Sequence, residues 1–208
     1  MSVQAIAVGG LACARGGQVV VANVTFEVRA GGALILKGPN GSGKTTLLRT
    51  IAGFLPTAAG QVQIDRGLDG AGDERTYHYV GHANAVKPRL SVLENVRFWQ
   101  RYYGGADDWD AAEGALSAFG ILDLADYRAG HLSQGQARRL GLARLLAAPR
   151  PVWLLDEPTV SLDAASSLQL ERVVADHLSG GGLAIVSTHL DLKLPGAAVL
   201  TLGGSGAT

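Results

Sequence analysis

The chain has 208 residues, of which 47% are hydrophobic, and its 18 basic residues balance its 18 acidic ones. This length and apolar fraction are enough for one large or two small domains with a full core. The balanced charge argues against a nucleic-acid partner, because nucleic-acid-binding proteins usually carry a basic excess or stripe. The single cysteine, Cys13, excludes an internal disulfide and is typical of a reducing compartment.

Neither end of the sequence predicts a targeting or membrane-spanning segment. The N-terminus, MSVQAIAVGG, lacks a basic region followed by a long apolar region. No apolar run approaches the roughly 20 residues that a transmembrane helix needs. We therefore expect an intracellular protein that is soluble or peripheral to a membrane.

The first third of the sequence predicts mainly strands. Residues 18–30 alternate between apolar and polar side chains, and residues 33–38 are an apolar run that ends in glycine. A helix is expected to follow at about residues 44–53. Two further strands are expected at residues 60–65 and 76–81, and the polar, glycine-rich residues between them predict a surface loop.

The middle of the sequence, from about residue 91 to residue 148, predicts helices. Ser91 with Glu94 and Ser133 with Gln136 have the spacing of capping boxes, so helices should begin just after each serine. An aspartate-rich first turn begins another helix in residues 108–120. The pattern after Gln136 predicts an amphipathic helix, and its three arginines are expected to form a solvated face: Arg138, Arg139 and Arg144.

After residue 151 strands and helices alternate again. Strands are expected at residues 152–156, 183–189 and 198–202, with a helix at about 164–178. Strands on both sides of a helical region predict an α/β core with an inserted helical subdomain. We expect a single domain over residues 1–208, with the core at 1–87 and 149–208 and the helical subdomain at 88–148.

Residues 38–46, GPNGSGKTT, follow an apolar strand and open a helix. This context and spacing match a phosphate-binding loop, in which backbone N–H groups and the helix N-terminus face phosphate oxygens. The ε-amino group of Lys44 is expected to reach the β- and γ-phosphates, and the hydroxyl of Thr45 to ligate Mg²⁺. The expected ATP-binding residues are Gly38, Pro39, Asn40, Gly41, Ser42, Gly43, Lys44, Thr45 and Thr46.

Three further polar residues are expected at the carboxyl ends of buried strands, where α/β proteins bind ligands. Asp156 ends the run VWLLD and suits a magnesium ion, usually held through water. Glu157 follows and is a candidate general base for an attacking water. His189 ends the strand LAIVSTH and is a candidate γ-phosphate contact. Together with the phosphate-binding loop, these residues predict Mg²⁺-dependent hydrolysis of a nucleoside triphosphate.

Five motifs in order, GPNGSGKTT, LSQGQ, VWLLDEP, SLD and STH, resemble the nucleotide-binding subunit of ABC transporters over nearly the whole chain. The resemblance implies a P-loop NTPase core of ABC ATPase type with an antiparallel β-subdomain and an inserted helical subdomain. It assigns the signature motif to Leu132, Ser133, Gln134, Gly135 and Gln136, the D-loop to Ser161, Leu162 and Asp163, and the switch histidine to His189. It also implies a head-to-tail dimer with a second copy, in which ATP lies between the phosphate-binding loop of one chain and the signature of the other.

Three positions depart from the pattern of that family. Gln134 stands where the signature has its first glycine. His82 stands where the family has the Q-loop glutamine, and we expect it to take the catalytic contact of that residue. Arg15 stands where the family has an aromatic that stacks on adenine, and a guanidinium group can also stack on a base.

Residues 79–99 and 154–166 are similar to a narrower group, the haem-exporter ATP-binding subunits of the cytochrome c maturation system. This resemblance implies a peripheral position on the cytoplasmic face of the bacterial inner membrane. It implies the membrane partners CcmB, CcmC and CcmD, and ATP hydrolysis that powers haem export or handling for cytochrome c biogenesis. The aromatic residues of one helical segment either dock on those partners or pack the helical subdomain: Phe98, Trp99, Tyr102 and Tyr103.

Three alternatives remain open from the sequence. A soluble ABC ATPase acting on nucleic acid or ribosomes would predict a basic patch or a long insertion, and neither is visible. A small-molecule kinase would predict a lid and an acceptor site in place of LSQGQ. An ABC subunit for another transported substrate would differ only in the amino-acid sequence of residues 79–99.

Overall fold

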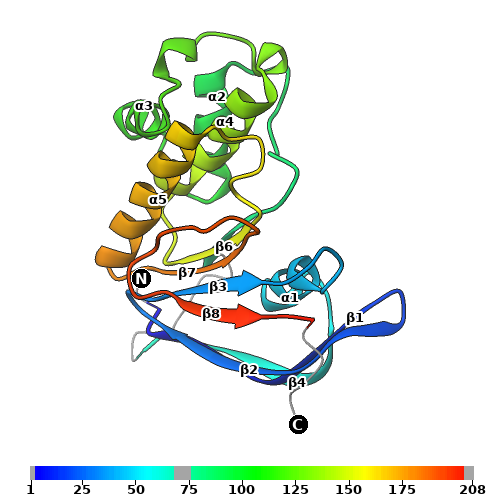
Figure 1. The fold of residues 1–208 in the computed structure, drawn as a ribbon. Helices are drawn as coiled ribbons and strands as arrows, with labels where there is room; N and C mark the ends of the chain where they lie inside the picture. The colour runs from blue at the N-terminus through cyan, green and yellow to red at the C-terminus, as the bar shows by residue number, and fades with distance from the viewer. Residues whose placement is uncertain (1–2, 68–75, 204–208) are drawn as a thin grey trace. The chain divides into compact units, whose positions relative to one another are not determined.

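The computed structural model describes residues 3–67 and 76–203, and it contains an antiparallel and a parallel sheet (Figure 1). The antiparallel sheet has the strand order β2-β1-β4, with β1 Ala5–Arg15, β2 Gln18–Arg29 and β4 Thr57–Asp65. The second sheet has the order β5-β6-β7-β3-β8 and its paired strands are parallel. Its strands are β3 Ala33–Lys37, β5 Tyr77–Val80, β6 Val152–Asp156, β7 Leu183–Ser187 and β8 Ala198–Thr201. The predicted fold class is confirmed, whereas most of the predicted loop at 66–75 lies outside the described residues.

A two-residue turn joins β1 to β2. Arg15 pairs with Gln18, and the residues between them, Gly16 and Gly17, have φ angles of 59° and 82°. Two consecutive positive φ angles are typical of the type I′ turn, whose twist suits a hairpin and which glycine adopts without strain. Cys13 is buried in β1.

The parallel sheet is built from short apolar runs. Every residue of β6 and β7 is buried, because a parallel strand inside such a sheet is covered on both faces. Helix α1, Lys44–Ile51, contributes Leu47, Leu48 and Ile51 to a core that also takes side chains from both sheets. Strands β3, β6 and β7 end at the same edge of the sheet, and that edge carries the site described below.

The described residues divide into two compact units. The sheet unit takes its residues from segments 1–81, 151–158 and 174–208, and the helical unit consists of His82–Arg150 and Thr159–Val173. The helical unit contains α2 Val92–Tyr102, α3 Trp109–Ala118, α4 Gln134–Ala147 and two short 3-10 turns, Leu122–Leu124 and Ala129–His131. Helix α5, Ala164–Ser179, has its N-terminal part in the helical unit and its C-terminal part in the sheet unit. Residues 82–87, 149–150 and 159–173 thus belong to the helical unit, in addition to the segment 88–148 expected from sequence.

Both predicted capping boxes are present. The hydroxyl of Ser91 accepts from the backbone N–H of Glu94, whose carboxylate accepts from the N–H of Ser91 at 2.7 Å. Ser133 and Gln136 make the same exchange at the start of α4. Each box satisfies two of the backbone donors that a helix N-terminus leaves without partners.

Helix α4 is not the amphipathic helix that the sequence predicted, because buried residues surround it on all sides. Arg138 and Arg144 are each only 3% exposed, so the expected solvated face is wrong for both. The guanidinium group of Arg144 lies 4.8 Å from the ring centroid of Trp99, and burial lowers its pKa. Arg139 is half-buried and donates to the carbonyl oxygen of Gly120 at 2.9 Å, at the end of α3. All three arginines therefore make tertiary contacts.

Four aromatic side chains form one cluster at the C-terminal end of α2: Phe98, Trp99, Tyr102 and Tyr103. Three of them are half-buried, and Tyr102 is 55% exposed. Three cations lie near their rings: Lys87 at Phe98, Arg144 at Trp99 and Arg150 at Tyr103. The cluster therefore packs within the helical unit and also presents one tyrosine to solvent.

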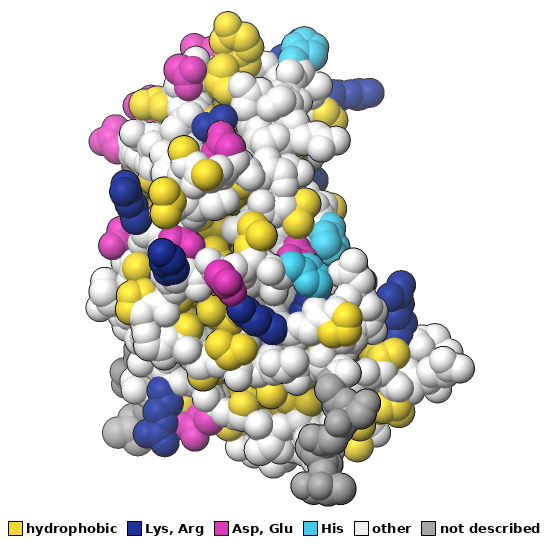
Figure 2. All heavy atoms as spheres, viewed as in Figure 1, with side chains coloured by type: hydrophobic (Ala, Val, Ile, Leu, Met, Phe, Trp, Pro, Cys, Tyr) yellow, Lys and Arg dark blue, Asp and Glu magenta, His cyan; other side chains and the backbone are white. Residues whose placement is uncertain are grey.

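The face that Figure 2 shows has no patch of charged side chains of a single sign. On the face that Figure 2 shows, side chains of both signs are interspersed, and hydrophobic groups lie between them. In the part of the chain that the structure describes, no helix is long and apolar enough to cross a membrane.

Candidate nucleotide-binding site

The loop between β3 and α1 requires glycine at two positions. Gly38 has a φ of 142°, and a Cβ atom there would lie 2.3 Å from the carbonyl oxygen of Leu202. Gly43 has a φ of 95°, and a Cβ atom there would lie 2.3 Å from Cγ2 of Val21. Any side chain at these two positions would make such a contact. The observed path of the loop therefore requires glycine at both positions.

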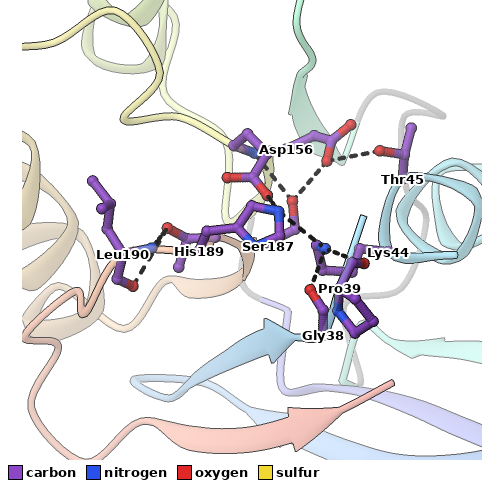
Figure 3. Close-up of polar contacts among 10 residues, drawn as sticks. Gly38, Pro39, Lys44, Thr45, Asp156, Ser187, His189 and Leu190 are labelled. Atoms are coloured by element: carbon purple, nitrogen blue, oxygen red, sulfur yellow. Dashed lines mark hydrogen bonds and ion pairs between the residues drawn. The ribbon is translucent and has the colours of Figure 1, made fainter. Parts of the chain in front are cut away.

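Helix α1 begins without a side-chain cap. Its N-cap residue is Gly43, and no acidic residue lies in its first turn. Its first N–H groups are therefore left for another acceptor, and the helix dipole favours an anion there. The Nζ atom of Lys44 donates to the carbonyl oxygens of Gly38 at 2.7 Å and Pro39 at 3.1 Å, so the lysine side chain lies across the loop (Figure 3).

Asp156 lies at the end of β6 and is 1% exposed. Its Oδ1 atom accepts from the hydroxyl of Thr45 at 3.1 Å and from the hydroxyl of Ser187 at 2.6 Å (Figure 3). Sequence reasoning missed Ser187, although Ser187 is the register partner of Asp156 at the end of the neighbouring strand β7. The structure thus brings together the two side chains expected at a magnesium ion, Thr45 and Asp156.

The chemistry of these two groups fits a hard cation. A hydroxyl and a carboxylate are oxygen ligands, and Mg²⁺ commonly takes one or two protein ligands together with water and substrate phosphates. Within residues 3–67 and 76–203, no group of three or more His, Cys, Asp or Glu side chains could form a metal cage. An ion at this position would therefore complete its coordination with water and phosphate oxygens.

Tyr79, on β5, is a second residue that sequence reasoning missed. Its hydroxyl donates to Oδ2 of Asp156 at 3.4 Å. Burial, and next the negative charge of Asp156, raise the pKa of Tyr79 to about 12. The phenol therefore remains a neutral hydrogen-bond donor to the carboxylate at any physiological pH.

Glu157 and His189 meet beside the phosphate-binding loop. Glu157 has a φ of 48°, unusual for a residue other than glycine, and its N–H donates to the carbonyl oxygen of Ser187 at 3.0 Å. Its Oε1 atom lies 3.2 Å from Nε2 of His189. The same Nε2 atom lies 3.4 Å from Nζ of Lys44. Three residues predicted separately from sequence thus converge at the carboxyl edge of the parallel sheet.

A second group of predicted residues lines a cavity of about 260 Å³ in the helical unit. The group consists of His82, Gln134 and Ser161, which come from three different segments of the sequence. The other lining residues are Asn84, Arg138 and Val160. Two of the three positions that depart from the family pattern, His82 and Gln134, therefore face one polar space.

The remaining signature and D-loop residues have local structural partners. A Cβ atom on Gly135 would lie 3.0 Å from the carbonyl oxygen of Ser161, whose own φ is 69°. Leu132 precedes the capping box of α4 and is half-buried. The N–H of Leu162 donates to the carbonyl oxygen of Thr159 at 3.1 Å. Asp163 accepts from the backbone N–H of Ser166 at 2.7 Å, which lowers the pKa of its carboxyl group.

The other expected ATP-binding residues follow the loop. Pro39, Asn40 and Gly41 are exposed, Ser42 is half-buried and Thr46 is buried in the first turn of α1. Arg15 lies at the end of β1 beside the Gly16–Gly17 turn, and its side chain is exposed.

A model of the ABC transporter family matches residues 21–160. A putative ABC transporter ATP-binding protein of Pyrococcus furiosus has a similar structure, with a TM-score of 0.84, 26% identity, and coverage of 95% of this chain and 97% of that chain. The ATP-binding cassette MJ0796, in the dimeric structure of a post-hydrolysis state bound to ADP and Pi, matches with a TM-score of 0.76 and 25% identity over 89% of this chain and 88% of that chain. The chain belongs to the ABC transporter family, and it is an ATPase that binds ATP and hydrolyses it to ADP and phosphate.

Within this family, the chain is similar to curated proteins that share one name. The cytochrome c biogenesis ATP-binding export protein CcmA of Paracoccus denitrificans is 50% identical over 198 residues, covering 95% of this chain and 89% of that protein. CcmA of Rhodospirillum rubrum is 47% identical over 196 residues, covering 92% of this chain and 83% of that protein.

Proposed function

We propose that this chain is the ATP-hydrolysing subunit of a membrane complex that exports or handles haem for cytochrome c biogenesis. The identity of about half with CcmA proteins over nearly the whole chain supports this function. The convergence of Lys44, Glu157 and His189 at one edge of the sheet is the structural observation that carries its chemistry. We also propose that residues 1–208 form a single nucleotide-binding domain.

In this proposal, the phosphate-binding loop holds the triphosphate of ATP. The uncapped N–H groups at the start of α1 bind phosphate oxygens, and Lys44 exchanges its two carbonyl acceptors for the β- and γ-phosphates. The exchange is favourable because an ammonium-to-phosphate contact is stronger than a contact to a neutral carbonyl. Arg15, exposed at the end of β1, is proposed to stack on the adenine.

Thr45 and Asp156 are proposed to hold Mg²⁺, directly or through water. The ion would neutralise charge on the phosphate oxygens during hydrolysis. Ser187 and Tyr79 keep the Asp156 carboxylate oriented through their hydroxyl groups.

Glu157 is proposed to accept the proton of the attacking water. His189, which lies between Glu157 and Lys44, orients that water or contacts the γ-phosphate. Glu157 is only 8% exposed, so few other waters compete with the attacking water at its carboxylate.

The signature residues and the D-loop are proposed to complete the ATP site of a second copy in a head-to-tail dimer. The capping box of α4 does not use the backbone N–H groups of Gln134 and Gly135, and these offer donors for a γ-phosphate. His82 is proposed to take the Q-loop position. The fold similarity to a dimeric ATP-binding cassette supports the dimer. Interspersed charge on the visible face gives no support to a nucleic-acid partner.

The complex would place this chain peripherally on the cytoplasmic face of the bacterial inner membrane, with CcmB, CcmC and CcmD as its membrane partners. A strain that lacks the chain tests this directly. We expect the strain to lose periplasmic c-type cytochromes, measured by haem staining, and to recover them with the wild-type chain but not with Glu157→Gln.

Affinity purification of the chain from native membranes provides the second measurement. We expect the three membrane subunits to co-purify with the chain. The preparation should also show Mg²⁺-dependent ATPase activity. Normal c-type cytochromes in the deletion strain, with different membrane proteins bound to the chain, would instead identify an ABC subunit for another substrate.

A further inference from the structure

The segment that carries His82, residues 82–87, lies directly on helix α4 within the helical unit. At Gly141 of α4, a Cβ atom would lie 2.9 Å from the carbonyl oxygen of Asn84 and 3.2 Å from its Cβ atom. Contacts below 3.0 Å to a backbone atom are essentially never tolerated, so alanine at position 141 would push the segment away. The absence of a side chain at Gly141 therefore permits the close approach.

One turn earlier on the same face of α4, Arg138 holds the same residue by its side chain. Its guanidinium group donates to Oδ1 of Asn84 at 3.1 Å. Arginine has donors only, so the amide of Asn84 must present its oxygen toward α4. Arg138 is 3% exposed, so its guanidinium group is largely buried. Asn84 is thus fixed to α4 through both its backbone and its side chain.

The other end of the segment is fixed to α2. The side chain of Asn95, which is 1% exposed, accepts from the N–H of Lys87 at 2.6 Å and donates to the carbonyl oxygen of Lys87 at 3.0 Å. Between the two attachments, Ala85 has a φ of 53°. A residue other than glycine rarely adopts this conformation unless its surroundings impose it. The segment is therefore held in one conformation by contacts at both ends.

The cavity described above joins this segment to the N-terminus of α4. His82 and Asn84 line it together with Gln134, the first residue of α4, and Arg138. A displacement of α4 along its axis would therefore act on Asn84 through Arg138 and Gly141, and on His82 through the backbone.

We propose that Asn84, Arg138 and Gly141 form a clamp that couples the His82 segment to the signature helix α4. Asn84 and Gly141 are positioning residues, because they transmit movement of the α4 N-terminus to His82. The coupling rests on the proposed function, in which nucleotide binds at the start of α4. The clamp itself is a property of the nucleotide-free chain.

Hydrogen–deuterium exchange of the purified chain without nucleotide tests the clamp. We expect Asn84→Ala and Gly141→Ala to raise the exchange rate of peptides within residues 82–90 by about fivefold, as loss of a single hydrogen bond implies. Peptides that cover residues 38–46 should exchange as in the wild type. Gly114→Ala is the matched control, because Gly114 is also inside a helix but faces open space, and it should leave residues 82–90 unchanged.

ATP turnover tests the coupling. We expect Asn84→Ala and Gly141→Ala to lower kcat about 10- to 100-fold, because a displacement of about 1 Å is enough for such a loss. The affinity of the isolated chain for ATP should stay the same. Asn84→Asp should retain most turnover, because a carboxylate also accepts from Arg138. Gly141→Ala and Gly114→Ala both raise helix propensity. Urea unfolding of each variant checks that it is folded under the assay conditions, so that a loss of activity in Gly141→Ala alone is not explained by unfolding.

Wild-type exchange of residues 82–90 in both clamp variants would overturn the clamp. Raised exchange with an unchanged kcat would overturn the coupling. The exchange measurement needs no nucleotide, so it decides on the clamp even if the wild-type chain proves to have no ATPase activity, which would instead contradict the proposed function.

Discussion

Nε2 of His189 lies 3.2 Å from Oε1 of Glu157, at the ends of the adjacent strands β7 and β6. A histidine this close to a buried carboxylate can form a hydrogen bond to the same water molecule, the one that attacks a phosphate. The contact joins Glu157, the proposed general base after β6, to His189 after the neighbouring strand β7. A small shift of either strand end would therefore change the position of the Glu157 carboxylate.

Glu157→Gln keeps the shape of this side chain and removes its ability to accept a proton. We expect ATP turnover to fall by about 10²- to 10⁴-fold, the usual contribution of a general base. The variant should still bind ATP. Because the bound ATP is not hydrolysed, an ATP-bound dimer should accumulate and be visible by size-exclusion chromatography. Phosphate release and nucleotide titration are the measurements. Hydrolysis at the wild-type rate would remove Glu157 from the proposed role.

Lys44→Ala removes the ammonium group that lies across the phosphate-binding loop. We expect the affinity for ATP to fall about 10- to 100-fold, because hydrogen bonds to charged groups are among the stronger ones. Lys37→Ala is the matched control: Lys37 ends β3 just before the loop, but its Nζ atom is paired with Asp191 at 2.5 Å. Isothermal titration with ATP compares the two, and equal effects would contradict the assignment of Lys44.

Ser187→Ala leaves the Asp156 carboxylate without the hydroxyl that donates to it at 2.6 Å. Loss of a partner that orients a metal ligand commonly costs about 10-fold or more in metal affinity. We therefore expect a higher Mg²⁺ concentration for half-maximal ATPase activity at saturating ATP. Ser179→Ala, which removes an exposed serine of the same unit, should leave this concentration unchanged. An unchanged Mg²⁺ dependence in Ser187→Ala would show that the carboxylate needs no such support.

The sequence predicted those features whose cause is local. A phosphate-binding loop depends on glycines and a lysine within residues 38–46, and each capping box depends on two residues three positions apart, such as Ser133 and Gln136. These interactions form within a few residues, so the spacing alone is informative. The alternation of strands and helices likewise predicted the α/β core and the helical region, whereas the antiparallel sheet was expected only from the resemblance to ABC ATPases.

The features that sequence reasoning missed depend on tertiary contacts. Ser187 reaches Asp156 only because β6 and β7 pair in one register. Arg138 and Arg144 look like solvated residues in the sequence, yet helices and a loop from distant segments cover them. Their burial could have been suspected only from the identity of their partners, Asn84 and Trp99, and those partners lie far away in the chain.

The ring of His177, near the end of α5, stacks on Trp153 with centroids 3.8 Å apart and planes inclined by 5°. Its Nε2 atom lies 3.3 Å from the carbonyl oxygen of Leu183. Gly182 leaves room for the ring, because a Cβ atom there would lie 2.2 Å from Cε1 of His177. Burial lowers the pKa of His177 below its usual 6.5, although the hydrogen bond to Leu183 opposes this effect.

This lowered pKa predicts how stability depends on pH. Below about pH 6.5 the unfolded chain takes up a proton at this histidine that the folded chain resists, so the free energy of unfolding should decrease as the pH falls from 7.5 toward 5.5. His177→Phe keeps an aromatic ring on Trp153 without a titrating group, and it should reduce the decrease. His131→Phe, at an exposed histidine, should keep it. Urea unfolding at several pH values measures the effect, and an identical pH dependence in wild type and His177→Phe would contradict the prediction.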